Sequence, residues 1–147
     1  MVKKLLIVGG VLVALVVVLV VTFSAQVNNL EKQLAATTIE NVDIATVADG
    51  EYIGEYDLKL VAARVRAVVR DGRLERLEIL EHRHGPGYGA EETADRIVEK
   101  QSLLVDAKSG ATGSSTVIRK AAELALKKGE GERTVPAEEP ADTTEEQ

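Results

Sequence analysis

The sequence predicts an α+β fold: a small antiparallel sheet with packed helices, preceded by one N-terminal transmembrane helix and followed by a disordered acidic tail. Three observations support this prediction. Residues 5–23 are apolar apart from Thr22, over a length that suits a bilayer if Thr22 is tolerated. Residues 59–82 alternate between apolar and charged side chains around a central Asp-Gly pair, which is typical of a β-hairpin. Residues 90–104 and 114–129 then have helical periodicity, and strands followed by helices indicate an α+β domain.

The apolar run follows Lys3 and Lys4, and residues 5–21 consist only of Val, Leu, Ile, Gly and Ala. Continued through Phe23, a helix rising about 1.5 Å per residue reaches roughly 28 Å, close to the hydrocarbon thickness of a bilayer. Because positive flanking charge favours the cytoplasm, we expect a single-pass cell-membrane protein with its N-terminus inside and its domain on the extracytoplasmic side. A cleaved signal peptide is the alternative, although its apolar region is usually shorter and Phe23 disrupts the small-residue pair before Ala25.

The chain is expected to divide into four parts. These are an anchor at 1–24, a stalk at 25–44, the main domain at 45–129 and the acidic tail at 130–147. In the stalk, Val27, Leu30 and Leu34 recur at helical spacing, which predicts a short helix that continues out of the membrane. The tail has neither a helical nor a strand period and contains two prolines, so we expect it to be disordered.

Charge and cysteine content exclude several classes of function. The formal net charge of −6 lies entirely in the tail, where seven acidic residues accompany one arginine. The rest of the chain sums to zero and has no basic patch with interleaved aromatic residues, so nucleic acid is not an expected partner. The absence of cysteine excludes disulfides, thiolate chemistry and cysteine-ligated zinc.

The strands are expected at the start of the domain. Residues 51–57 form a strand candidate that Gly54 interrupts, and residues 59–70 form a second strand with apolar side chains on one face and arginines on the other. The expected inward residues are Ala63, Val65, Ala67 and Val69, and the outward ones are Arg64, Arg66 and Arg70. Asp71-Gly72 is a strong hairpin signal, so residues 73–82 should return as the partner strand, with Leu77 and Ile79 inward.

Two helices are expected after a glycine-rich loop at 84–89. The first covers residues 90–104, with Ala90, Ala94, Ile97, Gln101 and Leu104 along one side. A second glycine-bearing loop follows at 105–113. Ser114 or Ser115 should then cap the last helix, which ends at Gly129. Its expected buried stripe is Val117, Ile118, Ala121, Ala122 and Ala125.

The segment Asp106-Ala-Lys-Ser-Gly-Ala-Thr-Gly-Ser-Ser115 is the strongest chemical signal in the chain. It is a hydroxyl-rich turn that leads into the N-terminus of a helix, where free N–H groups and the helix dipole favour a phosphate. It is not a Walker loop, because no Lys-Ser/Thr pair follows the glycines. From these residues alone, an anion site and an ordinary serine-capped helix behind a glycine turn both remain open.

This segment, together with DGEYIGEY at 49–56, the Asp-Gly hairpin and EHRHG at 81–85, resembles the FMN-binding domain family. That domain occurs in the FMN-bearing subunits of the sodium-translocating NADH:quinone reductase and of Rnf-type complexes, and in short standalone membrane-anchored proteins, which this chain resembles most. The most specific part is Asp-x-x-Ser/Thr-Gly-Ala-Thr, matched by Asp106, Ser109, Gly110, Ala111 and Thr112.

The resemblance implies that Thr112 accepts FMN from a flavin transferase as a phosphoester. It further implies that Asp106 belongs to the transferase recognition signal, and that Ser109, Ser114 and Ser115 donate to phosphate oxygens. The implied function is an extracytoplasmic electron carrier with a membrane redox donor and acceptor, rather than an enzyme with its own substrate. The alternative is a module that holds FMN or another ligand without covalent attachment and without redox turnover.

Four further residues are candidates near the site. Tyr52 and Tyr88 are aromatic side chains that could stack on the flavin ring, or serve only in packing. His82 and His84 could share one face of a strand, but the sequence offers no third ligand, so no metal site is expected. A nucleophilic enzyme is not expected either, because no histidine has a spacing that obliges it to activate a serine.

Overall fold

Strand β2 (Ala62–Arg70) is the centre of a three-stranded antiparallel sheet, with β1 (Gly50–Asp57) on one side and β3 (Arg73–Arg83) on the other. This computed structural model describes residues 2–85 and 89–130 of the chain. The residues predicted to point inward from the central strand are all at most 2% exposed; they are Ala63, Val65, Ala67 and Val69. The predicted antiparallel sheet and its inward face are therefore confirmed.

The hairpin between β2 and β3 turns at Asp71 and Gly72, as predicted. Both residues have positive φ, 50° and 69°, which is the geometry of the tight turn that favours an Asp-Gly pair. On the outer face of the sheet, Arg66 lies 3.7 Å from a carboxylate oxygen of Glu51 on β1 and 3.3 Å from one of Glu78 on β3. These side chains are at least 33% exposed to solvent, so the pairs contribute little stability.

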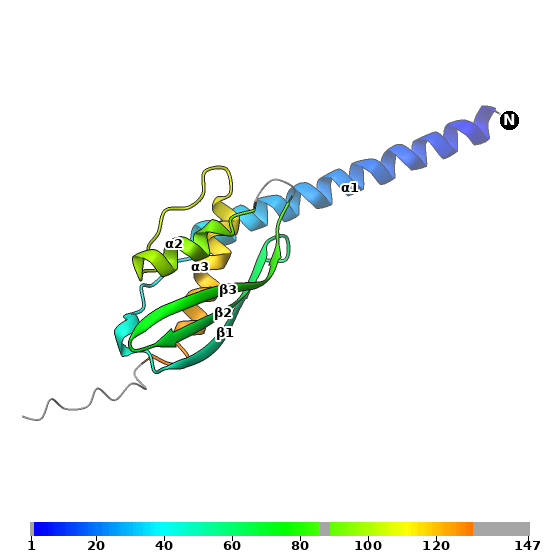
Figure 1. Ribbon diagram of the computed structural model, residues 1–147. Helices are drawn as coiled ribbons and strands as arrows, with labels where there is room; N and C mark the ends of the chain where they lie inside the picture. The colour runs from blue at the N-terminus through cyan, green and yellow to red at the C-terminus, as the bar shows by residue number, and fades with distance from the viewer. Residues whose placement is uncertain (1, 86–88, 131–147) are drawn as a thin grey trace, which may run out of the picture.

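Helices α2 (Glu92–Lys100) and α3 (Thr112–Leu126) cover the inner face of the sheet (Figure 1). Helix α3 packs on β1 and β2, whereas α2 packs on β3. The predicted stripe of α3 is fully buried, at 0% exposure for Val117, Ile118, Ala121, Ala122 and Ala125. The α+β fold class is thus confirmed, with one layer of helices on one sheet.

The first of these helices is shorter than the predicted helix at 90–104. It ends at Lys100 because Gln101 adopts a left-handed conformation with φ of 49°. The side chain of Gln101 then bonds to β3: its amide nitrogen donates to Leu74 O and its oxygen accepts from Leu74 N, both at 2.8 Å. Leu104, predicted to be inward, is 60% exposed, and Leu103 is buried in its place.

The prediction that Gly54 interrupts its strand is wrong, because β1 runs through it without a break. A Cβ atom at this position would lie 2.0 Å from the carbonyl oxygen of Ala121 and 2.6 Å from the amide nitrogen of Ala125. Only glycine therefore lets β1 approach the backbone of α3 this closely.

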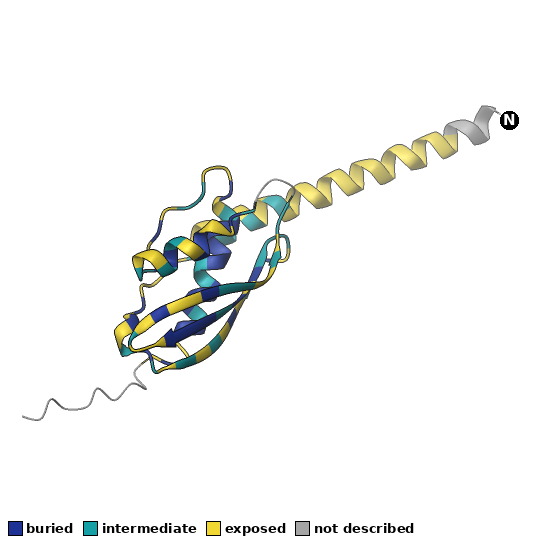
Figure 2. Ribbon diagram, viewed as in Figure 1, coloured by how far each residue is buried: buried dark blue, intermediate teal, exposed yellow. Residues whose placement is uncertain are grey.

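Helix α1 (Val2–Ala36) combines the predicted anchor and stalk helices in one continuous element. Its first two thirds extend away from the domain, and the side chains described there are exposed (Figure 2). It is the one helix in the described part of the chain that is long and apolar enough to cross a membrane. Its last turns lie against the domain, where Leu30 and Leu34 pack against the core.

Residues of the predicted stalk also enter the core. Val42 and Ile44 are 2% and 5% exposed, and Ile44 begins a short 3-10 helix, η1 (Ile44–Thr46). The predicted tail at 130–147 lies outside the described residues except for Glu130, which forms an isolated antiparallel bridge with Val47.

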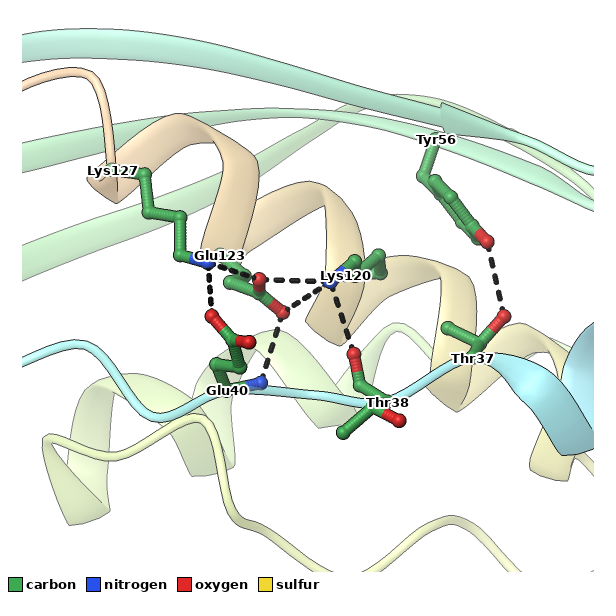
Figure 3. A network of polar contacts seen from close by, with 7 residues as sticks. All are labelled: Thr37, Thr38, Glu40, Tyr56, Lys120, Glu123 and Lys127. Atoms are coloured by element: carbon green, nitrogen blue, oxygen red, sulfur yellow. Dashed lines mark hydrogen bonds and ion pairs between the residues drawn. The ribbon is translucent and has the colours of Figure 1, made fainter.

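A buried carboxylate ties the segment after α1 to α3 (Figure 3). Glu123 is 0% exposed, and its oxygens accept hydrogen bonds from Lys120 Nζ at 2.8 and 2.9 Å and from the amide nitrogen of Glu40 at 3.1 Å. Lys127 Nζ lies 2.9 Å from the same carboxylate and also bonds to the side chain of Glu40. Burial would raise the pKa of Glu123, but these hydrogen bonds outweigh it and hold that pKa below its ordinary value.

Two further contacts complete this attachment. Lys120 Nζ donates to the carbonyl oxygen of Thr38 at 3.0 Å, and the hydroxyl groups of Thr37 and Tyr56 are 3.0 Å apart (Figure 3). The end of α1 is therefore bonded to both α3 and β1, which fixes the position of α1 beside the domain.

Candidate functional site

The loop before α3 ends in a tight turn that only a glycine completes easily. Ala111 N donates to Lys108 O at 3.0 Å, and Gly110, at the third position of this turn, has a φ of 78°. Such a turn needs a left-handed residue at that position, which explains the glycine. Thr112, the first residue of α3, follows this turn directly.

Helix α3 begins two residues before the predicted serine cap. Its N-cap is Ala111, which makes no side-chain capping bond, so the prediction of Ser114 or Ser115 as the cap is wrong. The Ser115 hydroxyl instead accepts from Lys108 N at 2.9 Å and from the Thr93 hydroxyl at 3.3 Å, which holds the loop against α2. Ser115 N is the first helical donor and bonds to Ala111 O, so the N–H groups of residues 112–114 have no acceptor within the helix.

The predicted site residues differ in their accessibility. Thr112, the first residue of the helix, is exposed. The predicted loop residues Asp106, Ser109 and Gly110 are exposed as well. Ala111 and Ser114 are buried at 4% and 2% exposure, and the Ser114 hydroxyl has no hydrogen-bond partner among the described residues. The site therefore combines an exposed hydroxyl with a buried polar atom that lacks a partner.

Two arginines that no sequence pattern singled out hold the loop in place. Arg119 donates to Val105 O at 3.0 Å, and Arg96 donates to the backbone oxygen of Asp106 at 3.3 Å. Burial lowers the pKa of Arg119, and the nearby carboxylate of Asp106 opposes that shift. Both contacts are long-range pairings with backbone carbonyls, which no sequence motif encodes.

A groove of about 710 Å³ runs from the start of α3 to helix α1. One wall is the motif, residues 110–114, and the opposite wall is the apolar side of α1. The α1 wall consists of Phe23, Val27, Leu30, Glu31 and Leu34, and the remaining lining residues are Leu60, Val61, His84 and Gly85. Its volume is in the range of ligand pockets, and its mostly apolar lining with a few polar groups is typical of them.

Of the two aromatic candidates, Tyr52 does not line this groove. Tyr52 donates to Ala48 O at 2.9 Å and packs against Gly50 and Gly129, so it serves in packing. Tyr88, predicted as a cofactor-binding residue, lies outside the described residues.

The two histidines meet a carboxylate that the sequence did not indicate. His82 Nδ1 and His84 Nε2 lie 3.1 and 3.8 Å from the same oxygen of Glu91, and the two rings are 4.4 Å apart. The hydrogen bond from His82 is the main reason that the pKa of Glu91 is below its ordinary value. Glu91 precedes α2, so only the packing of α2 on β3 brings it to these rings.

These observations define a class: a small α+β domain with a ligand-sized groove at a helix N-terminus, attached to an apolar helix that could span a membrane. The family model described as the FMN-binding domain matches residues 62–127, so this part of the chain is similar to that family. The match begins with β2 and ends just after α3, and it includes the whole motif. Comparison with curated proteins and with solved structures found no match.

The described residues fit FMN at three points. The groove is large enough for a flavin, its apolar walls suit the ring system, and α3 supplies free N–H groups at one end for the phosphate. Thr112 lies at that end and is exposed rather than covered by other side chains. Ser114 adds a buried hydroxyl that still needs a partner.

Proposed function

We propose that this chain is a membrane-anchored extracytoplasmic electron carrier that holds FMN through a phosphoester bond to Thr112. The observation that carries the proposal is the exposed hydroxyl of Thr112 at the first turn of α3, beside an apolar groove of about 710 Å³. The FMN-binding domain match at 62–127 supplies the cofactor class.

The phosphate end of the site would use the start of α3. The N–H groups of residues 112–114 have no acceptor within the helix, and the positive end of the helix dipole favours a negative ligand. Ser114 and Ser109 would donate to phosphate oxygens, whereas Ser115 would hold the loop through its bond to Lys108 N. Gly110 has no atom near its missing Cβ, so the backbone there stays open to a ligand.

The ring end of the site would lie between the motif and α1. Val27, Leu30 and Leu34 provide apolar surface along the groove, and Phe23, at the end of the apolar run, also lines it. If the apolar run spans the bilayer, the groove then lies at the membrane surface. This position supports electron exchange with donors and acceptors held in the membrane, which we propose as the redox partners.

Attachment requires a flavin transferase and an activated FMN whose phosphate carries a leaving group. The Thr112 oxygen forms a bond to phosphorus while the bond from phosphorus to the leaving group breaks, and the hydroxyl proton passes to a base of the transferase. Asp106 is exposed in the loop, where a transferase can reach it. FMN, once bound, supplies reversible one- and two-electron chemistry, and this chain supplies its position and surroundings.

The intact mass of the full chain, co-expressed with a flavin transferase and purified in detergent, tests the proposal. We expect the mass to rise by one FMN less one water, and the yellow colour to stay with the chain after unfolding. An unchanged mass with colour lost on unfolding would instead support the non-covalent binding module. Absence of flavin in both measurements would refute the proposal.

Cysteine labelling tests on which side of the membrane the domain lies. Because the chain has no native cysteine, only the introduced residue can react. Glu99→Cys on the exposed surface of α2 should react with an impermeant maleimide in intact cells. Val2→Cys, at the other end of α1, should react only after the membrane is opened. The reverse pattern would place the domain in the cytoplasm, and loss of the Val2→Cys segment from the mature chain would identify a cleaved signal peptide.

A further inference from the structure

The end of β3 and the start of α2 bring both histidines of the chain to one carboxylate. We propose that His82, His84 and Glu91 form a binding site for a divalent transition-metal ion of the zinc class. One ligand atom from each residue lies within 4.8 Å of the other two.

The spacing of these atoms suits a tetrahedral ion. Metal–ligand bonds of about 2.0–2.1 Å place tetrahedral ligands about 3.3 Å apart. The two histidine nitrogens lie 3.1 and 3.8 Å from Glu91 Oε1, so a small side-chain movement is enough to close the site. Three protein ligands leave the fourth position for water or another small ligand.

Hydrogen bonding orients His84 as a ligand. Its Nδ1 lies 2.7 Å from the carbonyl oxygen of Gly85, which can only accept, so Nδ1 carries the proton. In the neutral ring, Nε2 then has a free lone pair, and this is the nitrogen nearer Glu91. A backbone carbonyl behind a histidine is the usual arrangement that fixes the tautomer of a metal ligand.

His82 is held rigidly beside it. Its side chain is 4% exposed, it belongs to β3, and it pairs with Ala63 of β2. Nδ1 faces Glu91, and Nε2 is buried with no partner among the described residues. A metal ion can take the place of the proton between Nδ1 and the carboxylate, and the proton of the neutral ring then lies on Nε2.

The composition of the ligand set selects the ion. Two imidazoles and one carboxylate suit zinc, cobalt, nickel or copper better than magnesium or calcium. Because the chain has only these two histidines and no cysteine, it has no other nitrogen or sulfur ligands of this kind. His84 also lines the groove, so the ion would lie at the rim of the groove.

Zn²⁺ and Co²⁺ titrations of the untagged full chain in detergent, without flavin, test this site. Excess Mg²⁺ in the buffer occupies sites made of carboxylates alone. We expect one equivalent of Zn²⁺ to bind and displace Co²⁺, whose visible absorption reports nitrogen ligation. Glu91→Gln and His84→Ala should each weaken binding at least tenfold.

Glu92→Gln is the matched control, since Glu92 is the neighbouring carboxylate and pairs with Arg96 at 3.1 Å. It should bind Zn²⁺ as the unsubstituted chain does. Circular dichroism checks that each variant is folded, and Glu91 and His84 are accessible enough for substitution. Equal binding by the Glu91→Gln and unsubstituted chains, or no stoichiometric Zn²⁺ binding, would overturn the proposal. Because no flavin is present, neither result bears on Thr112.

Discussion

A chain with Thr112→Ala should carry no covalent flavin after co-expression with a flavin transferase. The substitution removes the hydroxyl that would form the phosphoester, and alanine offers no other nucleophile. The intact mass should therefore equal that of the unmodified chain, and flavin fluorescence should be absent from the denatured protein. Covalent flavin at the level of the unsubstituted chain would show that Thr112 is not the attachment residue.

This loss should occur without a change in the fold. Thr112 is exposed, and its side chain has no hydrogen-bond partner among the described residues. Alanine is also a better helix former than threonine, so the free energy of unfolding should change by less than about 0.5 kcal/mol. Circular dichroism and urea unfolding of the full chain in micelles measure this.

Three hydroxyl variants serve as matched controls. Thr112→Ser keeps a hydroxyl at the same position and should retain covalent flavin, at a level set by the transferase. Ser109→Ala and Ser114→Ala each remove a neighbouring hydroxyl and should also retain it. If Ser109→Ala lost covalent flavin and Thr112→Ala retained it, the attachment residue would be Ser109 instead.

The second large effect is expected from Glu123→Ala, which should lower the free energy of unfolding by about 2–4 kcal/mol at neutral pH. Glu123 is fully buried, and its removal takes one acceptor from each of two lysines and leaves the amide of Glu40 without the carboxylate that accepts from it. Urea unfolding of the full chain in micelles measures the loss. Glu99→Ala, which removes an exposed glutamate from α2, is the control and should change stability by less than about 0.5 kcal/mol. Equal stability of the two variants would mean that the buried network contributes nothing.

The stability difference between the unsubstituted chain and Glu123→Ala should depend on pH. The pKa of Glu123 in the folded protein lies below its ordinary value of 4.5, so the unfolded state takes up the proton first as pH falls. The contribution is fully present above pH 4.5 and is lost as pH falls through the folded pKa. The difference should therefore shrink below pH 4.5, and a constant difference across this range would contradict the assignment.

Much of the fold could be predicted because its signals are local. The alternation along β2, the Asp-Gly turn and the stripe of α3 each depend on residues close together in the chain, and each is confirmed. The errors fall where a distant contact decides the outcome. Helix α2 stops early because Gln101 bonds to Leu74, and Ser115 leaves the capping position because its hydroxyl bonds to Lys108 and Thr93.

The site shows the same division. The motif at 106–115 was visible in the sequence, but its groove was not, because one wall is formed by α1 residues about 80 positions earlier in the chain. Glu91 was likewise missed as a partner of His82 and His84, since no spacing rule joins a strand end to the start of the next helix.

The sequence by itself determined the apolar N-terminal helix, the hairpin, the amphipathic helices and the hydroxyl-rich motif, because periodicity and turn chemistry act over a few residues. Only the tertiary structure decided where α1 meets the domain, which hydroxyl stays exposed and which carboxylate joins the histidines. These depend on how closely whole elements can pack. At Gly54, the absence of one Cβ atom lets α3 contact β1, and the buried charge of Glu123 then holds the end of α1 to α3.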